Sequence, residues 1–323
     1  MAASRNKRNI DLPAQVSQQL AARLAGPENL CVGLSGGCDS VVLLHLLSRQ
    51  PCQGRLSAIH VHHGLSSNAD AWADFCAGLC AQLGVPLRVH RVQVDRTTGL
   101  GLEAAARQAR YQAFSVIEAD CLLLAHHRGD QAETLLFNLL RGTGIVGAAG
   151  MPGERQMGRY RLLRPLLGAS RAEIECYARA HGLSWVDDES NRDLSLSRNY
   201  LRHEVLTVAS RHFPAAESAL AQAAENFAEA GVLLDELAAA DWLAVAERDE
   251  ARLDALRLLS EARLKNLLRY HLRSLGWRVP VAARLDEFAR QLCSAGPDRH
   301  PELRLPDGVM RAGRGRLCWL VEK

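Results

Sequence analysis

The segment from Cys31 to Leu47 joins an apolar run, a short polar turn and a second apolar run. Residues 31–34 read Cys-Val-Gly-Leu, which predicts the end of a buried strand. Residues 41–47 read Val-Val-Leu-Leu-His-Leu-Leu, which predicts a helix packed on a sheet. Between them, 35–40 read Ser-Gly-Gly-Cys-Asp-Ser. A buried strand that turns at once into a buried helix constrains this part of the chain to a layered α/β fold.

The polar turn favours a bound anion. Gly36 and Gly37 have no Cβ, so their backbone can turn sharply and approach a ligand closely. The helix that follows offers unpaired N–H groups at its positive end, and Ser35 and Ser40 add hydroxyl donors. A carboxylate, Asp39, repels phosphate unless a cation lies between them, so the turn predicts a nucleoside triphosphate with Mg²⁺. The alternative is an ordinary strand-to-helix turn with Ser and Gly at a cap.

The turn is not a Walker A motif, because that motif has Lys directly after its second Gly. Cys38 occupies this position here, and the chain has only three lysines, Lys7, Lys265 and Lys323.

Composition indicates a globular chain with room for about two domains, since it has 323 residues of which 48% are hydrophobic. The net charge of +3 excludes a wholly basic surface, so a polyanion would have to meet local patches. Nine cysteines without a Cys-x-x-Cys pair predict reduced thiols in a cytoplasmic protein. We expect no signal peptide, because the start is polar and basic, and no membrane span, because no apolar run approaches about 18 residues.

Strands and helices alternate from residue 29 to about 210, which predicts a parallel, doubly wound sheet. The expected strands are Leu30–Leu34, Leu56–Val61, Leu87–Val92, Cys121–Ala125 and Tyr160–Leu163. The expected helices are Ser40–Ser48, Asn68–Leu83, Leu102–Ala119, Asp130–Leu140 and Arg171–His181. Sites in such sheets lie at the carboxyl ends of strands, so the residues after the first, second and fourth strands should meet along one edge.

A second domain is expected after Pro214, where long Ala- and Leu-rich helical stretches begin. We predict a nucleotide-binding catalytic domain at 1–212 and a smaller, mainly helical domain at 213–323, ending in short β-like segments over 301–320. Residues 142–158 are Gly-rich and predict a loop, with Arg155, Arg159, Arg161 and Arg164 near its exit.

Two histidine pairs, His62-His63 and His126-His127, raise the question of a metal site. Neighbouring strand residues point to opposite faces, so one pair cannot easily chelate one ion, and a zinc site is not favoured. For His63 a position lining the nucleotide and a simple loop-capping position both remain open.

Charged side chains at two helix starts have two interpretations each. Asp130 and Glu133 share a helix face and could hold an ammonium group, or could merely complement the helix dipole. Arg107 could pair with Glu103 on the surface, or Arg107 and Arg110 could reach phosphate or a substrate carboxylate.

The polar segment 188–203 enters another helix. Within it Arg198 and Arg202 lie one turn apart, which suits either a solvated face or a phosphate-contacting face.

Together these motifs resemble the tRNA(Ile)-lysidine synthase family, whose loop is the SGGxDS PP-loop of the N-type ATP pyrophosphatases. The matching stretches are Ser35–Ser40, Ile59–Leu65, Glu103–Tyr111, Asp130–Thr134, Leu140–Gly144, Arg164–Leu167, Asp188–Asn191 and Arg198–Arg202. They span most of 29–205, and the last two separate this family from other PP-loop enzymes. The resemblance implies that 1–212 is a Rossmann-like PP-loop domain that binds ATP and that the mainly helical domain at 213–323 binds tRNA. It also implies a reaction in which ATP adenylates C2 of the wobble cytidine of tRNA(Ile) with anticodon CAU, and free L-lysine then displaces AMP.

The resemblance also implies roles for particular residues. ATP contacts are implied for Ser35, Gly36, Gly37, Cys38, Asp39, Ser40 and His63, with Mg²⁺ held at Asp39 through ATP. Catalysis is implied for Asp39, Asp130, Glu133 and Arg107, and lysine binding for Asp130, Glu133, Arg107 and Arg110. Contacts with tRNA are implied for Arg164, Asn191, Arg198, Asn199 and Arg202. A homodimer is one option for the assembly.

Two departures and two rival functions stand beside this resemblance. The family usually reads His-x-Asp-Asp-Gln before the fourth helix, whereas Gly129 stands at the first Asp, and the third domain of many relatives is not expected here. One rival is a PP-loop tRNA thiolase, although thiolases generally need paired reactive or cluster-binding cysteines and Cys38 alone is a weak candidate. The other is a nucleotide-dependent RNA-binding module without catalysis, which would give Asp39, Asp130 and Glu133 no purpose.

Overall fold

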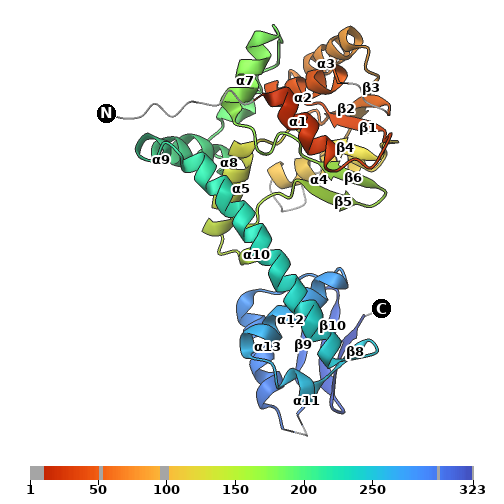
Figure 1. Ribbon diagram of the computed structural model, residues 1–323, viewed down its shortest axis with the longest axis vertical. Coiled ribbons are helices and arrows are strands. Elements are labelled where there is room, and N and C mark those ends of the chain that lie inside the picture. Colours follow the sequence, from red (N-terminus) through yellow and green to blue (C-terminus); the bar gives the residue numbers. More distant parts are fainter. Residues whose placement is uncertain (1–10, 51–53, 95–101, 297–298, 322–323) are drawn as a thin grey trace. The chain divides into compact units, whose positions relative to one another are not determined.

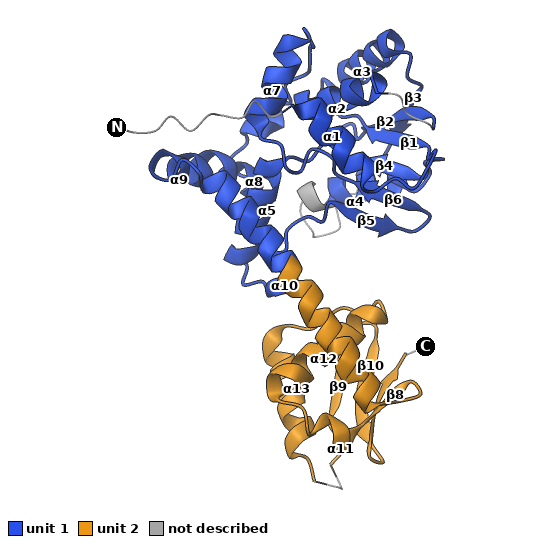
Figure 2. Cartoon of the chain, in the orientation of Figure 1, with its two compact units in different colours: residues 1–228 blue, residues 229–323 orange. Residues whose placement is uncertain are grey.

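A computed structural model describes residues 11–50, 54–94, 102–296 and 299–321 (Figure 1). The chain divides into two compact units, 1–228 and 229–323, which Figure 2 colours separately. The expected domain boundary at 212/213 stays a prediction. The helix α10, Ala216–Val245, is continuous across the division between the two units.

Unit 1 is built on a six-stranded sheet in the order β3-β2-β1-β4-β6-β5, and all neighbours except β5 and β6 run parallel. Its strands are β1 Leu30–Gly33, β2 Leu56–His62, β3 Leu87–Arg91, β4 Cys121–Leu123, β5 Glu154–Met157 and β6 Tyr160–Leu163. This confirms the predicted parallel sheet. Strand β5 was not expected, because it is an exposed, polar edge strand without the apolar alternation that identifies a strand.

Helices cover both faces of this sheet, as a doubly wound fold requires. The helices of unit 1 before α8 are α1 Leu12–Ala21, α2 Cys38–Ser48, α3 Ala69–Leu83, α4 Leu102–Phe114, α5 Arg128–Leu140, α6 Ile145–Ala148 and α7 Arg171–Ala180. One core joins the sheet to buried residues of α1, α2, α3 and α7, and a second core joins it to α4 through Phe114 (Figure 1). Helix α2 supplies nine buried residues, which explains the apolar run in the sequence.

Residues 197–212 form one helical stretch whose middle is widened. It consists of α8 Ser197–Tyr200, a π-helical segment Leu201–Leu206 (η2) and α9 Thr207–His212, and a 3₁₀ turn Glu189–Arg192 (η1) precedes it. Such i→i+5 segments are rare and are frequently found at functional sites. This one contains Arg202.

Unit 2 combines helices with a five-stranded antiparallel sheet in the order β7-β8-β11-β10-β9. Its strands are β7 Ala246–Glu247, β8 Glu250–Arg252, β9 Glu302–Leu305, β10 Gly308–Gly313 and β11 Arg316–Leu320, and its further helices are α11 Leu253–Leu256, α12 Glu261–Ser274 and α13 Ala282–Ser294. The helical part was predicted, and the expected β-like segments pair into this sheet. None of the helices in the described ranges is long and apolar enough to cross a membrane.

Candidate active site

The turn between β1 and α2 is shaped for an anion by its own hydrogen bonds. Gly36 has a φ of +90°, and a Cβ there would lie 2.9 Å from Cγ2 of Val186, so this position requires glycine. Ser40 Oγ donates to the Gly37 carbonyl (2.9 Å) and accepts from the Ser35 N–H (3.2 Å). The serine hydroxyls therefore hold the turn, a structural role that the sequence pattern did not distinguish from phosphate binding.

The N-terminus of α2 is left open by this arrangement. Gly37 is its N-cap, and no side chain of the described residues caps it. The first N–H groups of the helix are thus available to phosphate oxygens at the positive end of the helix dipole. The Cys38 side chain is 1% exposed and burial raises its thiol pKa to about 11, so only its backbone can meet a ligand.

Asp39 lies beside this open end, and its two carboxylate oxygens differ in their contacts. Its Oδ2 accepts from Arg171 Nη1 at 2.6 Å, while its Oδ1 is buried and has no hydrogen-bond partner among the described residues. Burial raises the pKa of the Asp39 carboxyl, against the opposing charges of His127 and Arg171. A carboxylate oxygen without a partner beside an anion site is a suitable Mg²⁺ ligand, so the residues fit the predicted ion.

Helix α5 begins with a reciprocal cap at the neighbouring strand end. The His127 N–H donates to Asp130 Oδ2 (2.9 Å), and His127 Nδ1 accepts from the Gly129 N–H (3.0 Å). A Cβ at Gly129 would lie only 2.8 Å from His127 Cε1 and 3.6 Å from Glu217 Oε2. Glycine at this position therefore leaves room for the His127 ring and avoids placing a carboxylate against Glu217.

Arg202 closes the site from the π-helical segment. Its Nε lies 2.5 Å from Glu133 Oε1, and its Nη2 lies 3.0 Å from Glu133 Oε2 and 3.2 Å from Asp130 Oδ1. Asp130 and Glu133 thus share one helix face, as predicted, and hold a cation together. This cation is a side chain of the same protein, and the Arg202 side chain, 39% exposed, is engaged by the two carboxylates.

The two carboxylates respond differently to their surroundings. Burial raises the pKa of Glu133, which is 3% exposed, although Arg202 partly opposes this. Burial also acts to raise the pKa of Asp130, but His127, His126 and the backbone hydrogen bond outweigh it and lower that pKa. Asp130 is therefore the more securely ionised member of the pair.

A second group of side chains surrounds His63 and His126. Burial is the main cause that lowers the pKa of both imidazoles, His126 to about 4, and the charge of Arg110 adds to it at each. Arg107 also acts on His126, and it contacts Tyr111 through a 3.3 Å hydrogen bond. The structure thus brings Arg107, Arg110 and His63 together near the start of α5, while the side chain of Glu103 lies outside the described residues.

The residues predicted to contact tRNA have mixed placements. Arg164 is 5% exposed and donates to His126 Nδ1 (3.3 Å) and to the Pro152 carbonyl (2.6 Å), and Asn199 is buried and donates to the Ser190 and Asp193 carbonyls. Their roles in tRNA binding stay predictions, although internal hydrogen bonds already occupy both side chains.

The other predicted tRNA contacts and the arginine cluster near Arg164 differ in exposure. Asn191 is exposed and Arg198 is half-buried. In the cluster, Arg159 binds the Ser115 and Ile117 carbonyls, and Arg161 pairs with Glu28 and Glu154.

Two components of the site were not found from the sequence. Arg171 carries no local signal, because it lies 132 residues from Asp39 and meets it only through the packing of α7 on α2. His127 was considered as a metal ligand but caps α5 instead. No group of three or more potential metal-ligating side chains occurs in the part of the chain that the structure describes.

The chain is similar to known proteins over most of its length. A PP-loop domain model matches residues 10–209, and a TilS substrate binding domain model matches residues 252–318. A tRNA(Ile)-lysidine synthase of Pseudomonas aeruginosa is 47% identical over 330 residues, covering 96% of this chain and 73% of that protein. One of Nitrosomonas europaea is 43% identical, covering 99% and 71%.

Among solved structures, the U34-tRNA thiolase NcsA of Methanococcus maripaludis with its [4Fe-4S] cluster matches with a TM-score of 0.58. It is 18% identical and covers 68% of this chain and 78% of that one, which is a likeness of fold alone.

Proposed function

This chain belongs to the tRNA(Ile)-lysidine synthase family, and we propose that it forms lysidine by joining free L-lysine to C2 of the wobble cytidine of tRNA(Ile) with anticodon CAU. ATP first adenylates the C2 oxygen and releases pyrophosphate. The ε-amine of lysine then attacks C2 and releases AMP. One observation supports these roles above all. The open N-terminus of α2 lies beside Asp39, and the Asp130–Glu133 cation site lies at the next strand end.

The triphosphate is placed on the open end of α2. The backbone N–H groups that follow Gly37 would hold its oxygens, while the Ser35 and Ser40 hydroxyls keep the turn rigid. Asp39 Oδ1 would hold Mg²⁺, which would neutralise the charge that develops on the departing pyrophosphate. Arg171 keeps the carboxylate oriented through its other oxygen.

Lysine is placed in the carboxylate pair of α5. Asp130 and Glu133 already bind a guanidinium, and an ammonium makes the same charge-assisted hydrogen bonds. We propose that Arg202 occupies the place of the lysine ammonium until lysine enters. The amine must lose a proton before it attacks, and Asp130 or Glu133 is within reach to accept it. Arg107 or Arg110 would pair with the lysine carboxylate.

The tRNA would approach over segment 188–203. Just before this segment, the Val186 N–H donates to the Gly36 carbonyl (3.0 Å) and so fixes the chain to the PP-loop. Asn199 holds the turn that presents Asn191, and Arg198 stands beside them. An anticodon-loop base is already partly unstacked, so its presentation costs little. The expected homodimer stays a prediction.

The test is incubation with ATP, radiolabelled lysine and a tRNA(Ile) transcript bearing CAU, followed by nucleoside analysis. Incorporated lysidine with equimolar AMP is expected. A transcript with a different wobble base should accept no lysine, and a thiolated nucleoside instead of lysidine would overturn the assignment.

A further inference from the structure

Arg171 is the first residue of α7, and its side chain reaches the open end of α2. Its Nη1 donates to Asp39 Oδ2 (2.6 Å), and its Nε donates to Glu175 Oε1 (3.0 Å). Asp39 is the second residue of α2, whose first N–H groups are open to phosphate oxygens. The guanidinium of Arg171 therefore lies beside the place that the triphosphate would occupy.

The packing of α7 on α2 fixes the position of Arg171. Six residues after Arg171, the Tyr177 hydroxyl forms a buried hydrogen bond of 2.9 Å with His45 Nδ1, and His45 likewise follows Asp39 by six residues. Two contacts with the same spacing require the two helices to run side by side in the same direction. Ile174 and Ala178 of α7 share one hydrophobic core with buried residues of α2. The core thus holds Arg171 at the start of α2.

The start of α7 itself is closed to a ligand. Ser170 Oγ accepts from the Glu173 N–H (3.3 Å), and Glu173 Oε2 accepts from the Ser170 N–H (2.7 Å). This reciprocal cap already places a carboxylate at the positive end of the helix. An anion is therefore expected at α2 and not at α7, and what α7 offers to it is the Arg171 side chain.

The Arg171 guanidinium has donors beyond those that its two carboxylate partners use. It carries five N–H groups, and its Nη2 makes no hydrogen bond to the residues that the structure describes. The side chain is 42% exposed, so a ligand can reach it. Burial acts to lower the pKa of Arg171, but Asp39 and Glu175 outweigh it and raise that pKa. A charged, planar group with donors to spare suits the oxygens of a phosphate.

We infer that Arg171 binds the departing pyrophosphate directly and that Glu175 orients the guanidinium for this contact. The inference rests on the proposed function, in which pyrophosphate leaves during adenylation. The bond between the C2 oxygen and the α-phosphorus forms while the bond from the α-phosphorus to the α,β-bridging oxygen breaks. The electron pair of the broken bond stays on pyrophosphate. Hydrogen bonds from Arg171 to the pyrophosphate oxygens would strengthen as this charge develops.

A purely orienting role of Arg171 makes a different prediction. In that case Arg171 would act only through Asp39, by directing the carboxylate that would hold Mg²⁺. Its removal would then cost nothing once Asp39 is neutral. A direct contact with phosphate, in contrast, does not need the carboxylate.

The experiment measures the affinity of the full chain for inorganic pyrophosphate by calorimetry, at saturating Mg²⁺ and without tRNA or lysine. Arg171→Ala should weaken binding about tenfold or more, because a hydrogen bond to a charged group is lost. A similar weakening should appear when Arg171→Ala is added to Asp39→Asn. Arg171→Lys should recover part of the affinity, because it keeps the charge but not the planar fork.

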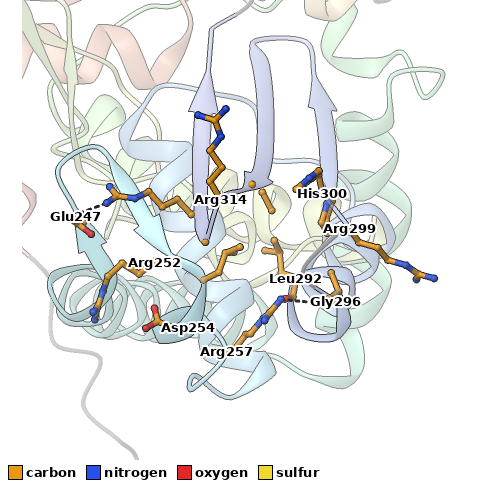
Figure 3. Close-up of a pocket in the computed structure, with 16 residues that line it drawn as sticks. Glu247, Arg252, Asp254, Arg257, Leu292, Gly296, Arg299, His300 and Arg314 are labelled. Atoms are coloured by element: carbon orange, nitrogen blue, oxygen red, sulfur yellow. Dashed lines mark hydrogen bonds and ion pairs between the residues drawn. The ribbon is translucent and has the colours of Figure 1, made fainter.

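Two arginines serve as matched controls. Arg179→Ala removes an equal charge from α7, where Arg179 pairs with the other oxygen of Glu175 (2.7 Å). Arg316 lines the pocket of unit 2 that Figure 3 shows, and it also bridges two carboxylates, those of Glu247 (2.9 Å) and Glu250 (3.2 Å). Arg179→Ala and Arg316→Ala should both bind pyrophosphate as the wild type does.

Unchanged pyrophosphate affinity in Arg171→Ala would overturn the inference. Equal affinities of Asp39→Asn and Asp39→Asn/Arg171→Ala would overturn it as well, because Arg171 would then act only through Asp39. Thermal melting checks that the variants fold. The proposed function is judged separately by lysidine formation in the wild type, so either conclusion can fail without the other.

Discussion

The guanidinium of Arg202 binds both carboxylate oxygens of Glu133, a residue that lies 69 positions earlier and is 3% exposed. Removing one member of such a pair leaves the other charge without compensation in a dry environment. The pair is therefore a structural contact, and under the proposed function Arg202 is the occupant that the lysine ammonium must replace.

Replacing Arg202 with Ala should lower the free energy of unfolding by about 2 to 3 kcal/mol, toward the low end for buried pairs because Arg202 is 39% exposed. The same change should lower the KM for lysine, because the ammonium no longer competes with the guanidinium. Arg263→Ala, which breaks a pair with the buried Asp241, is the control that should cost stability without altering the lysine KM. A raised lysine KM in Arg202→Ala would show that Arg202 helps to bind lysine.

Asp130→Asn and Glu133→Gln should separate the two half-reactions. Both variants should release pyrophosphate from ATP in the presence of tRNA, because the triphosphate lies on α2. Their KM for lysine should rise about tenfold or more, which corresponds to about 1.4 kcal/mol of lost binding. Equal loss of both half-reactions would place the lysine pocket elsewhere.

Asp39→Asn keeps the side chain's shape but removes the charge offered to Mg²⁺. The Mg²⁺ concentration for half-maximal pyrophosphate release should rise about tenfold or more, while tRNA affinity stays roughly the same. Asp74→Asn, on the exposed face of α3, should leave the Mg²⁺ requirement unchanged. Pyrophosphate release with normal Mg²⁺ dependence in Asp39→Asn would refute the assignment.

Gly129→Ala tests the cap of α5. The added Cβ would lie 2.8 Å from His127 Cε1, so the ring must move and its hydrogen bond to the helix should be lost, at a cost of about 1 to 2 kcal/mol. Lysine transfer should fall as well, because the displaced residue, His127, is the one whose backbone N–H donates to Asp130. Gly78→Ala in α3, where a Cβ meets nothing within 4 Å, should instead be neutral or stabilising by about 0.4 to 1 kcal/mol. Chemical denaturation and lysine transfer measure both effects.

The lowered pKa of Asp130 predicts a pH-dependent contribution to stability. Its folded pKa lies below the ordinary value of 3.8, so the ionised form stabilises the fold above that pH. This stabilisation should disappear as the pH falls through the folded pKa. The difference in unfolding free energy between wild type and Asp130→Asn, measured by urea denaturation, should thus be constant near neutrality and shrink in acid. A difference that grows as the pH falls would contradict the assignment.

The sequence was sufficient to predict what depends on local pattern. Buried strands such as β1 and β6 and the turn at Gly36 each carry a signal within a few residues, because burial and backbone conformation limit the residue types allowed there. The parallel orientation of the strands also followed, because strands that alternate with helices of this length pair in parallel. The shared face of Asp130 and Glu133 followed from helix geometry alone. The edge strand β5 was not predicted, because a strand exposed to solvent needs no alternating apolar pattern.

Only the tertiary structure could decide which charges meet. Nothing local connects Arg171 with Asp39, or Arg202 with Glu133, because such pairs form between elements that are distant in the chain and touch only after packing. The same arginine in a helix can serve a solvated face, a phosphate or a buried carboxylate, and its immediate neighbours do not distinguish these. A sequence limits where a charged side chain can lie. The partner of that side chain is fixed by the packing of α5 and α7 against the segments they touch. Burial makes an unpaired charge unfavourable, so the charges that packing brings together must pair.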